Sequence, residues 1–300
     1  MNRLIARRNK VHQSAVWSGR SAAIGALLFL LGSALPGWTY EETTVTNGGT
    51  VTGRVTLNGA PPPSRIFHMV FSPNIDFCTR VSDGKGNRLL KEFRVADDGG
   101  FQDVVVAVVG VEKGKRFDYA AQINLENCRI APFVTPVRNH QSFTIVNRDP
   151  VVHDVQGYTL KDNYTYAMFN KPMLPEDQAV KEIQLRKDHY IFRTQCGVHD
   201  FMQSWGMAVG NPYFAVTGSD GSFSIPDLPP GTYDVIAWHP YMQVRAQQIT
   251  VQANGQVSLN FQFNADEVTI PLYSLQTGYR LEPALGLIPL HPPSVELQTP

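Results

Sequence analysis

Residues 189–202 limit the possible folds more than any other part of the chain. Residues 189–196 alternate in character and predict a β-strand. One face of that strand would carry Tyr190, Phe192, Thr194 and Cys196. The loop that follows brings His199 and then Met202 at intervals of three residues. A soft thiolate and an imidazole that converge on one point suit copper, and a weak axial thioether completes a blue-copper set. The fold therefore needs a β-sheet with Cys196 at the end of one of its strands.

A blue-copper ligand set needs a second imidazole from another part of the chain. His153 is the best donor. It follows an alternating stretch, residues 141–146, which places Phe143 and Ile145 on one face of a second predicted strand, and a turn around Pro150. His153 would then join Cys196, His199 and Met202 at one metal site.

This combination resembles the cupredoxins, and the short Cys-x-x-His-x-x-Met loop is most similar to that of the amicyanin-like members. The resemblance covers roughly residues 119–212 and implies a Greek-key β-sandwich. It also implies one type 1 copper, held by His153, Cys196, His199 and Met202. Two departures stand out. Asp154 occupies the position after the first histidine where cupredoxins usually have Asn, and Met207 offers a second thioether as an alternative axial ligand.

The first 39 residues predict an export signal. Basic residues precede an apolar run at 22–31, which is short for a membrane span, and cleavage is expected before Tyr40. The protein is then periplasmic or otherwise extracytoplasmic. The alternative is an uncleaved N-terminal anchor, and only in that case would the chain contact a membrane.

Export makes the three cysteines informative, because an oxidising compartment leaves one of three unpaired. Cys78 and Cys128 lie outside the ligand motif and are expected to form a disulfide. Cys196 is then the free thiol, as a copper ligand must be.

Residues 213–239 predict strands separated by turns at Asp220-Gly221 and Pro229-Pro230-Gly231. The patterns T-x-x-D-G-x-F and P-P-G-x-Y resemble the carboxypeptidase regulatory-like β-sandwich. The first strand of that family resembles the stretch at Gly53-Arg54-Val55. An apolar run at 104–111 predicts a strand that is buried on both faces.

The predicted fold is therefore all-β, with one sandwich inserted in another. Residues 43–118, with an irregular loop at 73–100, and 213–263 would form the regulatory-like sandwich, and 119–212 the cupredoxin. Residues 264–300 are rich in proline and predict an extended tail. The alternative is two tandem domains with an N-terminal extension.

The charges exclude one class of partner. Lys plus Arg and Asp plus Glu both number 26, so no basic excess is available for nucleic acid. Charged residues make up only 17%, beside 24 glycines and 21 prolines, which is typical of turn-rich β proteins. Four further histidines are not expected to bind copper. His68 and His140 lack a neighbour at ligand spacing, His189 lies on the strand face opposite Cys196, and His239 is expected to be packed in a strand.

The expected function is electron transfer between periplasmic redox proteins, not catalysis. By resemblance to cupredoxins, electrons would leave through His199, on a loop beside Phe201. Trp205 belongs either to the same docking surface or to the core. A weaker resemblance to methylamine-utilisation proteins hints at a periplasmic dehydrogenase as electron donor. The alternatives are a copper-delivery protein without redox duty and an enzyme that uses Cys196 as nucleophile and His199 as base.

Overall fold

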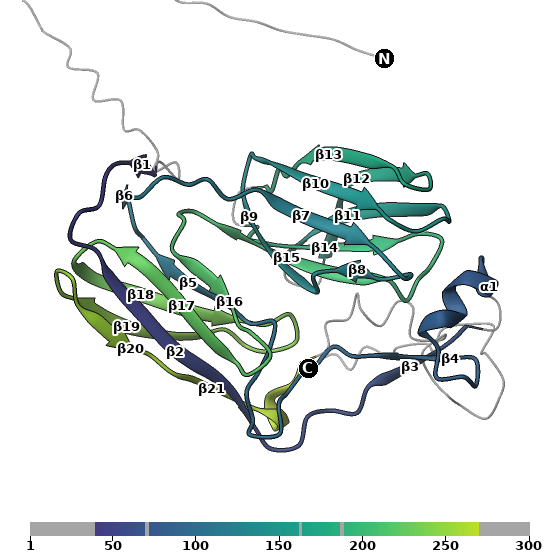
Figure 1. The fold of residues 1–300 in the computed structure, drawn as a ribbon, viewed down its shortest axis with the longest axis horizontal. Coiled ribbons are helices and arrows are strands. Elements are labelled where there is room, and N and C mark those ends of the chain that lie inside the picture. The colour runs from purple at the N-terminus through teal and green to yellow at the C-terminus, as the bar shows by residue number, and fades with distance from the viewer. Residues whose placement is uncertain (1–39, 70–71, 162–163, 187–188, 270–300) are drawn as a thin grey trace, which may run out of the picture. The chain divides into compact units, whose positions relative to one another are not determined.

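The computed structural model describes residues 40–69, 72–161, 164–186 and 189–269, and these form an all-β fold (Figure 1). All of them belong to one compact unit, residues 38–300. The predicted export signal lies outside the described residues, as does most of the predicted tail. The described start of the tail contains a short 3-10 helix, η2 (Ala265–Glu267). In the described part of the chain, no helix is both long and apolar enough to cross a bilayer.

The first sandwich consists of two sheets built from strands between residues 121 and 209 (Figure 1). The smaller sheet has the order β13 (Gln178–Glu182), β10 (Ser142–Asn147), β7 (Ala121–Leu125), β8 (Ile130–Ala131). The larger has the order β12 (Tyr164–Met173), β11 (His153–Lys161), β14 (Ile191–Cys196), β15 (Gln203–Val209), β9 (Val134–Arg138). Alternation along the strands buries Phe143, Ile145 and Phe192 in the core between them.

The second sandwich combines strands from both ends of the described chain (Figure 1). One sheet has the order β16 (Phe214–Val216), β5 (Val105–Val109), β18 (Gly231–Trp238), β19 (Arg245–Val251). The other contains β17 (Ser222–Leu228), β2 (Gly49–Asn58) and β20 (Gln256–Ser258), with β21 (Phe261–Asn264) also paired to β2. A short parallel pair joins β1 (Glu41–Glu42) to β6 (Lys113–Gly114). The chain thus leaves this sandwich after β5 and returns to it at β16.

Strand β5 is buried on both faces from Val105 to Val108, as its apolar sequence predicts, and only Val109 at its end is exposed. Val106 and Val108 belong to the core of the second sandwich. Val105 and Ala107, on the other face, belong to a separate cluster that also contains Trp205 of β15. Continuous burial explains why this strand lacks the polar alternation of a half-exposed one.

Trp205 is a core residue rather than part of a docking surface. Its side chain is 1% exposed, and its ring centroid lies 5.6 Å from that of Tyr241. Strand alternation directs Trp205 away from the core of the first sandwich and into the cluster that also contains residues of β5.

The stretch between β2 and β5 is more regular than predicted. The predicted irregular loop, residues 73–100, contains β4 (Asn87–Leu90), which pairs with β3 (Arg65–His68) just before that loop. Between them lie α1 (Ile75–Cys78) and the 3-10 helix η1 (Thr79–Val81). These short elements are stabilised by burial against other parts of the fold, so their own sequence carries no strong local pattern. Phe67, Met69 and Cys78 all enter the core of the first sandwich.

A disulfide ties this stretch to the first sandwich. It joins Cys78, at the end of α1, to Cys128, between β7 and β8, across a separation of 50 residues. Both half-cystines are buried, and Cys196 is the free cysteine. This is the pairing that the cysteine count predicts for an exported chain.

Candidate metal centre

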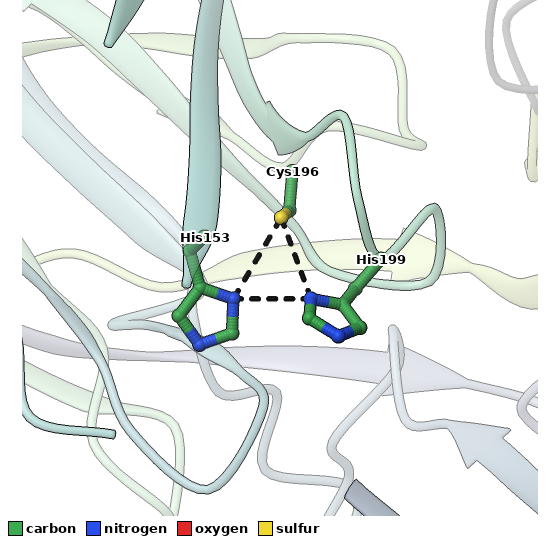
Figure 2. A group of neighbouring side chains, drawn as sticks. All are labelled: His153, Cys196 and His199. Atoms are coloured by element: carbon green, nitrogen blue, oxygen red, sulfur yellow. Dashed lines mark hydrogen bonds between the residues drawn. The ribbon is translucent and has the colours of Figure 1, made fainter. Parts of the chain in front are cut away.

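Two neighbouring strands and one loop bring three ligand atoms together (Figure 2). His153 is the first residue of β11 and Cys196 the last residue of β14. The two strands are antiparallel, with Val155 opposite Cys196, so both side chains lie at the same end of the sheet. His199 comes from the loop between β14 and β15.

The distances within the cluster are short. Cys196 Sγ lies 3.7 Å from His153 Nδ1 and 3.6 Å from His199 Nδ1, and the two Nδ1 atoms are 3.1 Å apart (Figure 2). All three side chains are buried. Within the described residues, this is the group of His, Cys, Asp and Glu side chains that could hold a metal ion.

The ligand loop is closed by its own backbone. The N–H of Cys196 donates to the carbonyl of Met202 at 3.1 Å, and the N–H of Met202 donates to the carbonyl of His199 at 2.9 Å. The N–H of Gly197 donates to the carbonyl of Asp154 in β11. These bonds hold His199 next to the thiol and attach the loop to the strand that begins with His153.

Each imidazole is oriented by a hydrogen bond on its outer nitrogen. His153 Nε2 lies 2.9 Å from Asp149 Oδ2, and His199 Nε2 lies 3.1 Å from the carbonyl oxygen of Pro73. Because a carboxylate and a carbonyl oxygen can only accept hydrogen bonds, both Nε2 atoms carry the proton and donate the hydrogen bond. The lone pairs of both Nδ1 atoms are then left facing Cys196 Sγ. Such outer hydrogen bonds are typical of metal-bound histidines, where they fix the tautomer and the ring orientation.

Asp149 is itself held in place by the backbone. The N–H groups of Asn127 and Cys128 donate to its two carboxylate oxygens at 2.6 and 2.8 Å. Burial raises the pKa of Asp149, but these bonds and the one from His153 outweigh burial and hold that pKa below its ordinary value. Burial likewise lowers the pKa of His153, yet its bond to Asp149 and the neighbouring sulfur of Cys196 outweigh burial and raise that pKa above the ordinary value.

The site favours a thiolate at Cys196. Burial raises the pKa of the thiol, but the two imidazoles beside Sγ and the hydrogen bond from the N–H of Asp154 outweigh burial and lower the pKa to about 6. A thiolate is the form that binds metals. Asp154 contributes here through its backbone N–H, which any residue but proline would supply. Its presence where cupredoxins have Asn therefore leaves this hydrogen bond intact.

The two candidate axial thioethers lie in different places. Met202 is 1% exposed and packs in the same core cluster as Cys196. Met207 lies opposite Ile191, at the other end of β14 from Cys196, and packs in the cluster on the other face of the sheet. Strand alternation explains the difference, since Met207 shares a face with Trp205 and not with the ligands. Met202 is therefore our axial candidate.

Replacing the axial thioether is expected to change the reduction potential without removing copper. We predict that Met202→Leu retains copper and colour but raises the potential, because Cu(II) loses a weak donor. Met207→Leu is the matched control, with the same substitution away from the cluster, and should leave the potential nearly unchanged. Protein-film voltammetry of both variants measures this. The opposite pattern would move the axial assignment to Met207.

His199, the expected electron exit, does not reach the surface. Its side chain is 0% exposed and Phe201 only 3% exposed. The covering chain is Pro73 and Asn74, whose amide nitrogen Nδ2 lies 3.5 Å from His199 Nε2. These two residues escaped the sequence analysis because they lie more than 120 residues before His199. Asp149, only four residues before His153, is a contact that spacing alone could have suggested.

The remaining histidines lie elsewhere in the fold. His68 Nδ1 is 2.8 Å from Asn87 Oδ1, and His189 Nδ1 is 2.9 Å from Thr159 Oγ1. His140 is exposed near Glu182. His239 is 0% exposed and packs against the rings of the aromatic residues Phe93, Phe101, Phe133 and Tyr241.

Comparisons with known proteins bear on both sandwiches. The family model of the carboxypeptidase regulatory-like domain matches residues 207–264, which confirms the resemblance seen in the turn patterns. No curated protein matches the chain significantly.

Solved structures that match include several cupredoxins. A purple cupredoxin from Nitrosopumilus maritimus is 16% identical over 30% of this chain and 99% of its own, with a TM-score of 0.25. Amicyanin from Paracoccus versutus is 15% identical over 35% of this chain and 97% of its own, again with a TM-score of 0.25. A copper-containing nitrite reductase from Thermus scotoductus is 11% identical over 34% of this chain and 25% of its own, also at 0.25. Because these scores are low, the case for copper rests on the cluster itself, whose His-Cys-His set fits a blue-copper site.

Proposed function

We propose that this chain is a blue-copper protein that carries single electrons. The supporting observation is that a thiol and two imidazoles converge, and that each imidazole donates from Nε2 to an acceptor outside the cluster. His153 Nδ1, Cys196 Sγ and His199 Nδ1 would hold the metal, with Met202 as a weak axial ligand. When bound, copper supplies a one-electron couple between Cu(II) and Cu(I). The protein contributes a fixed ligand set and hydrogen bonds that tune the potential.

Burial of the cluster favours this role over the two alternatives. His153 and His199 are 0% exposed and Cys196 is 1% exposed. A nucleophilic cysteine must meet its substrate, and a delivery site must release its metal to a partner; both need access to the cluster. An electron crosses a covering layer of protein without such access. The closed cluster therefore supports an electron carrier.

The partner and the location are part of the same proposal. An electron carrier needs a redox protein as its partner, and the balanced charge of the chain argues against nucleic acid. A disulfide between Cys78 and Cys128 is typical of an oxidising compartment, which supports export to the periplasm or beyond the cell.

The visible spectrum of the Cu(II)-loaded protein tests the proposal. We expect an intense band, because charge transfer from a thiolate to Cu(II) in a trigonal site is strong, and a reversible one-electron couple in voltammetry. A colourless complex with tetragonal features in the electron paramagnetic resonance spectrum would instead support copper delivery. Retention of zinc with no affinity for copper would indicate a structural metal site.

A further inference from the structure

Pro73 and Asn74, together called the strap here, cover the outer edge of His199. The carbonyl oxygen of Pro73 lies 3.1 Å from His199 Nε2, and Asn74 Nδ2 lies 3.5 Å from the same atom. The strap is itself exposed, whereas His199 is fully buried. A single layer of chain therefore separates this imidazole from solvent.

The position of the Pro73 carbonyl depends on the backbone of Asn74. Asn74 has φ 54° and ψ 35°, in the left-handed region that asparagine tolerates better than most residues. Rotation about φ of residue 74 turns the peptide that carries the Pro73 carbonyl. The next turn then begins at once, because the carbonyl of Asn74 accepts from the N–H groups of Phe77 and Cys78. A left-handed residue 74 is thus what directs the carbonyl of residue 73 to His199.

The strap is anchored on both sides. Before it, Phe67 is 1% exposed and its ring centroid lies 5.1 Å from that of Phe201, in the ligand loop. After it, Cys78 forms the disulfide to Cys128. The guanidinium of Arg88, in β4, donates to the carbonyl of Cys128 at 2.7 Å and lies over the ring of Phe201.

The same disulfide links the two segments that contact or carry the hydrogen-bond acceptors of the two imidazoles. On one side, Cys78 lies five residues after Pro73, whose carbonyl oxygen accepts the hydrogen bond from His199 Nε2. On the other, the N–H of Cys128 donates to Asp149 Oδ2, the oxygen that accepts from His153. One covalent bond therefore joins the two segments that orient the ligand rings.

We infer that the strap is a positioning element of the metal centre, supplied by the stretch between strands β2 and β5 of the second sandwich. The Pro73 carbonyl holds His199 in the tautomer with the proton on Nε2, so that Nδ1 faces Cys196. The covering chain also keeps water from the imidazole edge. The regulatory-like half of the molecule thereby completes a ligand geometry in the other half. The effect on copper rests on the function proposed above, whereas the effect on the tautomer does not.

A matched pair of substitutions at residue 74 isolates the backbone contribution. Asn74→Gly and Asn74→Val both remove the side-chain amide. Glycine adopts positive φ readily, and a β-branched residue resists it. Glycine should therefore keep the Pro73 carbonyl on His199, and valine should displace it. Asn74→Ala, with a smaller penalty than valine, serves if the valine variant does not fold.

The first measurement uses the metal-free protein. Long-range ¹H–¹⁵N spectra of the His199 ring should show the Nε2–H tautomer in the native protein and in Asn74→Gly, with slow exchange of that proton with water. In Asn74→Val the second tautomer and faster exchange should appear. Identical His199 spectra in the glycine and valine variants would overturn the inference, whether or not the protein binds copper.

The second measurement uses the copper-loaded protein and a competing chelator. Loss of a partner of a metal-bound histidine typically weakens metal binding by about 10–100-fold. We expect a loss of about tenfold in Asn74→Val relative to Asn74→Gly, with a shifted reduction potential. Equal affinity and potential in the two variants would also contradict the inference. Failure of the native protein to bind copper would instead overturn the proposed function and leave the tautomer result standing.

Discussion

Cys196→Ser is expected to lose the intense visible band of the Cu(II)-loaded protein while keeping its fold. The band arises from charge transfer from a thiolate, and a serine hydroxyl does not supply that donor. Serine is close to cysteine in size, and its oxygen can still accept the N–H of Asp154 that now binds Sγ. We expect copper affinity to fall by more than the 10–100-fold typical of changes around a ligand. Absorption spectroscopy and chelator competition measure the two effects.

Gln195→Ala is the matched control for this prediction. Gln195 is the neighbour of Cys196 in β14, on the opposite face of the strand, where it donates to Gln156. This variant should keep the band and the affinity. Circular dichroism should show the same β-rich spectrum in both variants. A strong thiolate band that survives in Cys196→Ser would show that the ligand assignment is wrong, because the other two cysteines are paired.

Removing the disulfide with Cys78→Ala and Cys128→Ala is expected to lower the free energy of unfolding by about 4 kcal/mol. The bond closes a loop with a sequence separation of 50 residues, and the estimate follows from the chain entropy that such a loop removes from the unfolded state. Urea denaturation followed by circular dichroism measures the change. We also expect weaker copper binding, since Cys128 holds Asp149 and Cys78 anchors the strap.

Two controls accompany the disulfide variant. Alkylation of the unfolded, unreduced, metal-free protein should label Cys196 alone, which establishes the pairing. The native protein in strong reductant should then unfold at the same urea concentration as the double variant. The estimate would be contradicted if the free energies of unfolding of the native protein and the double variant differed by less than about 1 kcal/mol.

The parts of the metal centre that could be read from sequence are those encoded locally. Alternation in residues 189–196 places Tyr190, Phe192, Thr194 and Cys196 on one face. The last three are buried in the structure, whereas Tyr190, just before β14, is exposed. The spacing of Cys196 and His199 keeps both on one short loop. His153 could be named because it follows a predicted strand and a turn, although that strand is β10 of the smaller sheet and His153 itself begins β11 of the larger sheet. Periodicity and short-range spacing carry this information without any long-range contact.

The parts that escaped prediction depend on contacts between distant segments. The burial of His199 comes from Pro73, 126 residues away in sequence. The core position of Trp205 depends on packing against Tyr241 and β5. The hairpin of β3 and β4 is stabilised by burial rather than by its own pattern. No local signal distinguishes an exposed aromatic or histidine from one that another segment covers.

The order of strands along the chain has a consequence for how the protein is made. Strand β2 ends at Asn58, and its antiparallel partner β17 begins only at Ser222. A chain that emerges N-terminus first therefore leaves β2 with unpaired edges until most of the protein is available. The strands from β7 to β15 complete their own sheets earlier, with more local contacts, which favour faster folding. The ligand-bearing sandwich is thus expected to fold first, before the strands that precede it in sequence have paired with those that follow it.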